Sequence, residues 1–103
     1  VIDSSVFPDG EKALTKELII RDGGQLDYQR HMHRGEVWTV ISGTGEAVLD
    51  GLVQQVRAGS VLQIPETTPH SVRALGGELH VIEVQHGETL VKEDIERLGA
   101  FWK

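Results

Sequence analysis

The sequence has 103 residues, of which 39% are hydrophobic and 25% charged. This is the size and composition of a single globular domain, expected to span residues 1–103. Ten Lys and Arg residues against sixteen Asp and Glu residues give a formal net charge of −6. A surface of that sign repels phosphate backbones and anionic lipids, so neither nucleic acid nor membrane is expected as a partner. The absence of cysteine excludes disulfides and thiolate metal sites and fits a reducing compartment, so we expect a cytoplasmic location.

Short segments rich in Val, Ile, Leu and Thr alternate with turn signals along most of the chain, and twelve glycines separate them. In chain order the predicted strands are Leu14–Arg21, Leu26–His33, Glu36–Ser42, Glu46–Leu49, Leu52–Val56, Val61–Ile64, His70–Ala74 and Leu79–His86. Asp50-Gly51 is the clearest hairpin signal, because glycine accepts the positive φ that a two-residue type I′ turn requires. Frequent turns between short strands favour an all-β sandwich or barrel.

One helix is predicted, near the C-terminus. Over residues 92–99, Ile95 and Leu98 lie three positions apart, acidic residues crowd the first turn, and Gly99 can end the helix. This pattern predicts one or two helical turns that cover an end of the barrel.

A homodimer is predicted from the strands at 37–41 and 79–84, where both faces carry apolar side chains. In so small a barrel, a strand that is apolar on both faces indicates a second sheet packed outside it.

His31 and His33 form an H-x-H pair. On an extended strand both imidazoles project from one face, together with Asp27 and Gln29. Burying such a polar face is costly unless its groups have partners, and a bound metal is one such partner. Glu36 follows a short turn and can return a carboxylate toward the pair. Two surface histidines on one strand would produce the same spacing, so the pair alone leaves both interpretations open.

His70 directly follows a turn bounded by Pro65 and Pro69. Neither proline can donate a hydrogen bond to a β-ladder, so the turn is rigid and suited to aiming one side chain. His70 is that side chain, and the alternative is a solvent-exposed loop histidine.

The cupin superfamily has two motifs that this sequence resembles, Gly24-x6-His31-x-His33-x2-Glu36-x6-Gly43 and Gly59-x5-Pro65-x3-Pro69-His70. The gap before the glutamate is short for a cupin. Segments 29–38, 41–45, 64–70, 81–88 and 93–97 more closely resemble the type II phosphomannose (mannose-6-phosphate) isomerase cupin, which occurs alone or at the end of mannose-1-phosphate guanylyltransferases. The resemblance implies a small cupin-type β-barrel (a double-stranded β-helix, or jelly roll) made of two antiparallel sheets, with a divalent metal inside.

The resemblance also implies the metal ligands, which are His31, His33, Glu36 and His70. Three imidazoles and one carboxylate suit one divalent transition metal (Zn, Mn, Fe, Co or Ni) and leave positions open for a substrate. Ligand type does not choose among these metals.

The activity implied by the resemblance is aldose–ketose isomerisation of mannose 6-phosphate to fructose 6-phosphate. A metal would polarise the sugar carbonyl while a base moves a proton between C1 and C2. Two glutamates are candidate catalytic bases, Glu83 in the last predicted strand and Glu66 in the turn before His70. Five further residues are candidates for substrate binding, since guanidinium groups bind phosphate bidentately and the others flank the motif: Gln29, Arg30, Arg34, Arg73 and Trp38.

Departures from the family pattern concern the substrate side of the site. Val37, Thr67, Ser71 and Ala74 stand where relatives usually carry His, Gly, Arg and Asn. None of the four is a predicted ligand. Two other functions therefore stay open, another metal-dependent cupin enzyme (an oxygenase or a sugar-processing enzyme) and a non-catalytic sugar-binding or regulatory module. The expected partner in the isomerase and module hypotheses is a small sugar or sugar phosphate.

Overall fold

The computed structural model describes residues 2–6 and 12–102, and every helix or strand in this part of the chain is a β-strand. The strands are β1 (Ile2–Val6), β2 (Lys12–Ile20), β3 (Gln29–Arg30), β4 (Gly35–Ser42), β5 (Thr44–Leu49), β6 (Leu52–Arg57), β7 (Val61–Ile64), β8 (His70–Ala74), β9 (Leu79–Gly87) and β10 (Glu96–Arg97).

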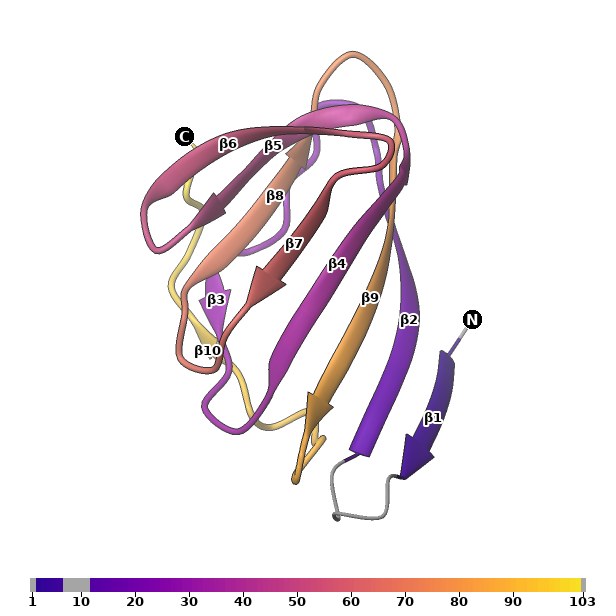
Figure 1. The fold of residues 1–103 in the computed structure, drawn as a ribbon. Helices are drawn as coiled ribbons and strands as arrows, with labels where there is room; N and C mark the ends of the chain where they lie inside the picture. The colour runs from indigo at the N-terminus through magenta and orange to yellow at the C-terminus, as the bar shows by residue number, and fades with distance from the viewer. Residues whose placement is uncertain (1, 7–11, 103) are drawn as a thin grey trace.

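The strands form two antiparallel five-stranded sheets, one in the order β1-β2-β9-β4-β7 and the other in the order β10-β3-β8-β5-β6. Figure 1 shows β5, β6 and β8 on one side of the molecule and β2, β4 and β9 on the other. The longest pairing joins β2 to β9, from Lys12↔Gly87 to Ile20↔Leu79. The predicted all-β barrel of two antiparallel sheets is confirmed.

The core lies between the sheets, and the side chains that point into it change from apolar to polar along the strands. In β9, buried residues alternate with half-buried ones, as a period of two requires. The buried residues of β9 are apolar at its start (Leu79, Val81) and polar further on (Glu83, Gln85). The paired strand β4 changes in the same place, because Trp38 lies opposite Glu83. One half of the barrel interior is therefore apolar and the other half is polar.

The predicted hairpin is confirmed by the backbone of Asp50 and Gly51, whose φ angles are 49° and 81°. Positive φ at both central residues defines a type I′ turn, which matches the twist of the strands it joins. Leu49 pairs with Leu52 directly beside this turn. A second glycine is required between β4 and β5, since a Cβ on Gly43 would overlap the backbone carbonyl of Glu78.

The predicted C-terminal helix at 92–99 is wrong. In its place the chain forms the short strand β10, which pairs with β3, and the amide of Leu98 donates to the carbonyl of Tyr28. These long-range hydrogen bonds replace the i→i+4 bonds that a helix of one or two turns would have made, and so short a helix is only marginally stable by itself. Among the described residues, no helix has the length and apolar character needed to cross a membrane.

The predicted strand Leu26–His33 is largely replaced by irregular backbone. Only Gln29–Arg30 forms a strand, and an isolated bridge joins Gln25 to Arg73. After Arg30 the chain bends through residues 31–34 before β4 begins. The extended geometry assumed for the H-x-H pair is therefore absent.

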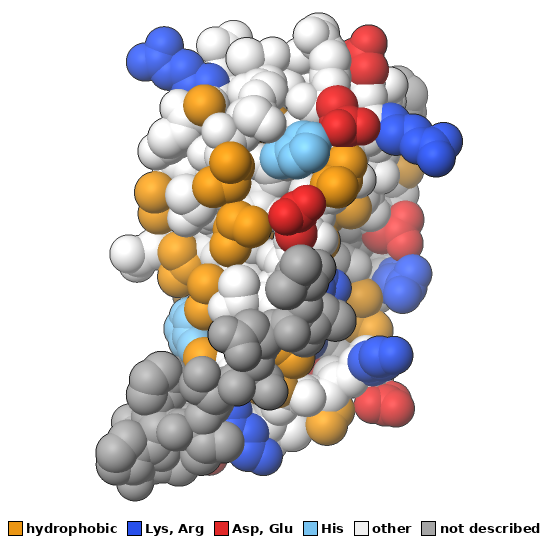
Figure 2. Space-filling view, turned by 90° about the vertical axis from the view of Figure 1, so that its right-hand side faces the viewer, with side chains coloured by type: hydrophobic (Ala, Val, Ile, Leu, Met, Phe, Trp, Pro, Cys, Tyr) orange, Lys and Arg blue, Asp and Glu red, His pale blue; other side chains and the backbone are white. Residues whose placement is uncertain are grey.

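The outer face of strands β9, β4 and β7 carries a band of apolar side chains. Cross-strand partners share a face, so the pairs Val37↔Val84 and Thr39↔Ile82 place these side chains together, and the pair Thr39↔Val61 extends the band to β7. Val61 is 58% exposed. Figure 2, which views the molecule from the side of β1 and β2, shows hydrophobic side chains over the left and centre, with a histidine and acidic side chains among them, and further charged side chains along the right edge.

We propose that a second copy of the chain covers this apolar face, and we expect light scattering to measure a mass of two chains at micromolar concentration. Val61→Lys should shift that mass toward one chain, because it places a charge in the interface. Leu52→Lys is the control, since Leu52 is also exposed to solvent but belongs to the other sheet. A wild-type mass of one chain would contradict the proposal.

Candidate metal centre

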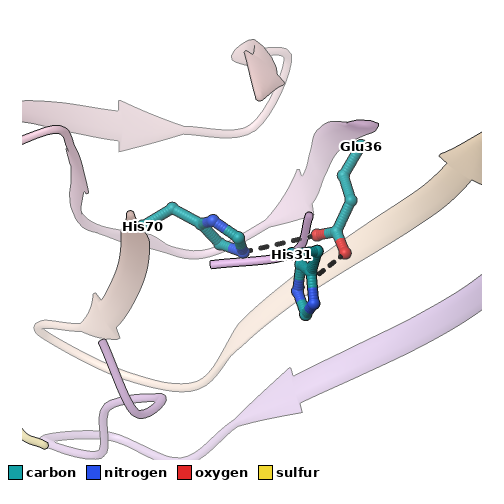
Figure 3. Close-up of side chains that lie close together, drawn as sticks. All are labelled: His31, Glu36 and His70. Carbon is teal, nitrogen blue, oxygen red and sulfur yellow. Dashed lines mark ion pairs between the residues drawn. The ribbon is translucent and has the colours of Figure 1, made fainter. Parts of the chain in front are cut away.

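His31, Glu36 and His70 meet inside the polar half of the barrel, and their ligand atoms all lie within 4.8 Å of one another. His31 follows β3, Glu36 lies in β4 and His70 begins β8. Oε2 of Glu36 is 3.2 Å from Nε2 of His31, and Oε1 is 3.6 Å from Nε2 of His70. Figure 3 shows the two rings turned toward the carboxylate from different parts of the chain. All three side chains are at most 2% exposed.

Backbone carbonyls determine which ring nitrogen of each histidine carries the proton. Nδ1 of His31 lies 2.7 Å from the carbonyl of Asp94, and Nδ1 of His70 lies 2.9 Å from that of Thr68. A carbonyl only accepts, so both Nδ1 atoms donate and both Nε2 atoms present lone pairs to Glu36. Burial lowers the pKa of His31 and lowers the pKa of His70 to about 4, so both rings are neutral near pH 7.

This donor set fits a divalent metal. Two lone pairs and a buried carboxylate converge, and such a group of acceptors is unfavourable without a cation. Nε2 of His70 is buried and has no hydrogen-bond partner among the described residues. Two imidazoles held through Nδ1 by backbone carbonyls, with a carboxylate beside them, are typical of transition-metal sites. His31, Glu36 and His70 are the residues that would hold the ion.

His33 lies outside this group, and its side chain is exposed. Because the chain bends after Arg30, residues 31 and 33 do not project from one face of a strand. The backbone amide of His33 instead donates to the carboxylate of Asp94. The structure thus brings together three of the four predicted ligands.

Arg34 reaches into the group from the bend between β3 and β4. Its Nε donates to Oε2 of Glu36 over 3.0 Å, and its terminal nitrogen lies 3.2 Å from Nε2 of His31. The side chain is buried. Arg34 was predicted to contact substrate phosphate, but in this structure its guanidinium serves as the counter-ion of Glu36.

Glu83 lies next to the group on β9 and is buried. Nε1 of Trp38 donates both to Oε1 of Glu36 (2.9 Å) and to Oε1 of Glu83 (3.1 Å), and the Gln85 amide donates to Oε2 of Glu83. Burial, with the nearby Glu36 carboxylate, raises the pKa of Glu83 to about 7. Nζ of Lys16 is 3.7 Å from Oε2 and opposes this shift. Period two alone leaves the orientation of Glu83 open, and the structure turns it into the barrel interior.

A cavity of about 390 Å³ opens beside Glu83 and His31. Among the described residues, four cationic side chains line it and Glu83 is the one acidic residue of the lining. The four are Lys16, Arg34, Lys92 and Arg97. On a chain with a net charge of −6, this local excess of positive charge favours an anionic ligand.

The other predicted site residues are divided between this cavity and the surface. Gln29 lines the cavity. Arg30 pairs with Glu96 on β10, and Arg73 pairs with Glu46 and stacks on the ring of Trp102. Glu66 is exposed. Arg30, Arg73 and Glu66 do not line the cavity.

Sequence analysis missed the other cavity cations and Asp94. Lys16 carried a detectable signal, because it stands between Leu14 and Leu18 in one period-two row of β2 and therefore faces inward with them. Lys92 and Arg97 lie in the segment that was predicted as a helix, and nothing local marks them as cavity residues.

Asp94 joins the C-terminal segment to the bend that carries His31. Its carboxylate accepts hydrogen bonds from the amides of Met32 (2.8 Å) and His33 (2.9 Å), while its carbonyl accepts from His31. Burial raises the pKa of this carboxyl, but the two amide hydrogen bonds outweigh it, so the pKa lies below its ordinary value. Asp94 therefore orients His31, one of the three candidate ligands.

Solved structures with the same arrangement of strands are cupins and related enzymes. Oxalate decarboxylase from Bacillus subtilis superposes with a TM-score of 0.78 over 94% of this chain and 27% of that one, at 17% sequence identity. A cupin protein from Bacteroides fragilis superposes with a TM-score of 0.65 over 89% of this chain and 80% of that one, at 16% identity. The fold is therefore the cupin double-stranded β-helix, as predicted.

The narrower family follows from the sequence itself. The family model described as "Mannose-6-phosphate isomerase C-terminal" matches residues 3–100, and the chain belongs to this family. It is 37% identical to alginate biosynthesis protein AlgA from Pseudomonas putida over 89 residues, which are 85% of this chain and 18% of that protein. It is 32% identical to mannose-1-phosphate guanylyltransferase from Salmonella muenchen over 95 residues, 91% of this chain and 20% of that protein. The chain thus spans about a fifth of the length of these relatives.

Asp94→Ala should weaken zinc binding about tenfold, because the bend that carries His31 loses its carboxylate clamp. It should also lower the free energy of unfolding by about 1 kcal/mol, since two partly buried amides lose their charged acceptor. Calorimetric zinc titration and urea unfolding measure the two effects. Asp22→Ala is the control, because that carboxylate accepts from the exposed amide of Gly77. Unchanged zinc affinity in Asp94→Ala would contradict the positioning role.

Glu83→Gln should remove one pH dependence of stability. The folded carboxyl has a pKa of about 7 and an ordinary value of 4.5, so the wild type loses stability as the pH rises through this window and the unfolded chain ionises first. At pH 8 the variant should be more stable relative to wild type than at pH 4.5, by up to about 3 kcal/mol. Urea unfolding of both proteins at the two pH values tests this. A pH-independent difference would contradict it.

Proposed function

We propose that this domain is a metal-dependent aldose–ketose isomerase that interconverts mannose 6-phosphate and fructose 6-phosphate. The description of the matching family names the enzyme that catalyses this reaction, mannose-6-phosphate isomerase. The observation that most supports the reaction is Glu83, a buried carboxyl whose pKa is about 7 and which lines a cation-rich cavity beside the three candidate metal ligands.

Glu83 suits proton transfer between C1 and C2 of a sugar. A general base is most effective when its pKa lies near the working pH, because it can then both accept a proton and return it. Trp38 and Gln85 hold the carboxylate by hydrogen bonds to its two oxygens. A divalent metal, when bound, supplies Lewis-acid polarisation of the sugar carbonyl.

The cavity also supports a phosphorylated substrate. Lys16, Lys92 and Arg97 line it together with Arg34 and provide the positive charge that a phosphate dianion needs. Of the arginines proposed for this role from the sequence, only Arg34 lies in the cavity lining. We therefore assign phosphate binding mainly to residues of β2 and of the C-terminal segment.

We expect the zinc- or manganese-loaded protein to convert mannose 6-phosphate to fructose 6-phosphate in an NMR assay. Glu83→Gln should reduce turnover at least about a hundredfold, because the base is removed while its hydrogen-bonding shape is kept. Glu66→Gln should leave turnover near wild type, since that side chain is exposed. Absence of conversion with metal bound would contradict the proposal, and iron-dependent oxygen consumption with an unphosphorylated substrate would favour the oxygenase alternative.

A non-catalytic sugar-binding module is the second candidate, and Arg34 is the observation that favours it. Its guanidinium already neutralises Glu36, so the polar half of the barrel is electrostatically balanced without a metal. Saturable binding of mannose 6-phosphate by the metal-free protein, with no conversion when metal is added, would support the module.

A further inference from the structure

The Arg34 guanidinium occupies the position beside Glu36 that a metal ion would take. The carboxylate oxygen that the guanidinium holds at 3.0 Å, Oε2, is also the one that lies 3.2 Å from Nε2 of His31. The same guanidinium approaches Nε2 of His31. Arg34 thus engages one oxygen of Glu36 and the lone pair of His31. Among the described residues, Nε2 of His70 is left without a hydrogen-bond partner.

An Arg34 guanidinium and a metal ion compete for the same electrons. Nε2 of His31 has a single lone pair, which cannot accept an N–H hydrogen bond and coordinate an ion at the same time. Two positive charges at one carboxylate also repel each other in a buried site. Metal binding to Glu36 and His31 therefore requires the guanidinium to move.

The cavity is the space into which the side chain can move. Arg34 already contributes to its lining, next to Lys16, Lys92 and Arg97. An arginine released from Glu36 keeps its charge and its five donors, which match the oxygens of a phosphate or sulfate.

We propose that Arg34 is a displaceable internal cation. In the metal-free chain it neutralises Glu36, and when a metal binds it turns into the cavity and becomes a ligand for an anion. Metal binding is thereby opposed by Arg34, while anion binding to the metal-loaded chain is assisted by it. The anion half rests on the proposed function, and the metal half does not.

The test compares Arg34→Gln with Arg97→Gln, since both variants remove one arginine from the cavity lining and Arg97 pairs with Asp27 rather than Glu36. By calorimetry, Arg34→Gln should bind zinc about tenfold more tightly than wild type, because no hydrogen bond to a charged group has to be broken. The zinc-loaded variant should bind sulfate about tenfold more weakly. Arg97→Gln should change zinc affinity little.

Tighter zinc binding together with weaker sulfate binding distinguishes displacement of Arg34 from a merely structural defect, which would weaken the binding of both ions. Unchanged or weaker zinc binding by Arg34→Gln overturns the metal half, and unchanged sulfate affinity overturns the anion half. Arg34→Lys keeps Glu36 neutralised and serves if the glutamine variant does not fold. Its single ammonium cannot match the guanidinium fork, so its zinc affinity should lie between those of wild type and Arg34→Gln.

A second measurement needs no variant. In wild-type protein labelled with nitrogen-15, the Nε–H resonance of Arg34 should shift as zinc is added, in proportion to the zinc bound. A resonance that stays unchanged at zinc saturation shows that the guanidinium remains on Glu36 and overturns the proposal. These outcomes are independent of turnover, so the inference and the proposed isomerase can fail separately.

Discussion

The structure depends on the neutralisation of one buried carboxylate. Glu36 is 1% exposed, and the nearest ring nitrogens of His31 and His70 turn lone pairs toward it because their Nδ1 atoms donate to backbone carbonyls. A buried carboxylate surrounded by acceptors costs several kcal/mol unless a cation lies beside it. The folded chain must therefore hold a positive charge at this point, and Arg34 supplies one.

The same strand register that forms the core also forms the site. β4 and β9 pair from Val40↔Val81 through Trp38↔Glu83 to Glu36↔Gln85, so each step along the pair moves from apolar to polar interior. Trp38 marks the boundary, because its ring is buried while its Nε1 donates to both carboxylates. Burial raises the pKa of Glu83 and lowers those of the two histidines. One cause, removal from water, thus keeps the Glu83 carboxyl partly protonated near neutral pH and leaves the two candidate ligands neutral.

The sequence predicted those parts of the molecule that depend on local pattern. Period-two rows and glycine turns located β2 and the strands from β4 to β9, and the proline-bounded turn located His70. The errors lie where distant contacts decide. Residues 92–99 carry a helix-like pattern, but they form a strap whose hydrogen bonds run to Tyr28 and to the amides of Met32 and His33. The same contacts bend the chain at 31–34, which removes His33 from the group and brings Arg34 into it.

The charge distribution explains why the position of Arg34 matters for anion binding in the cavity. The chain carries ten Lys and Arg residues against sixteen Asp and Glu residues, and its cations include four that line one cavity. An acidic exterior repels an approaching anion at long range, so retention has to come from short-range contacts inside the cavity. How many cations can make those contacts depends on whether Arg34 is engaged by Glu36. Under the proposed displacement, binding of a metal ion at Glu36 and binding of an anion in the cavity are therefore coupled. By linkage, the metal ion and the anion must each change the affinity of the other by the same factor.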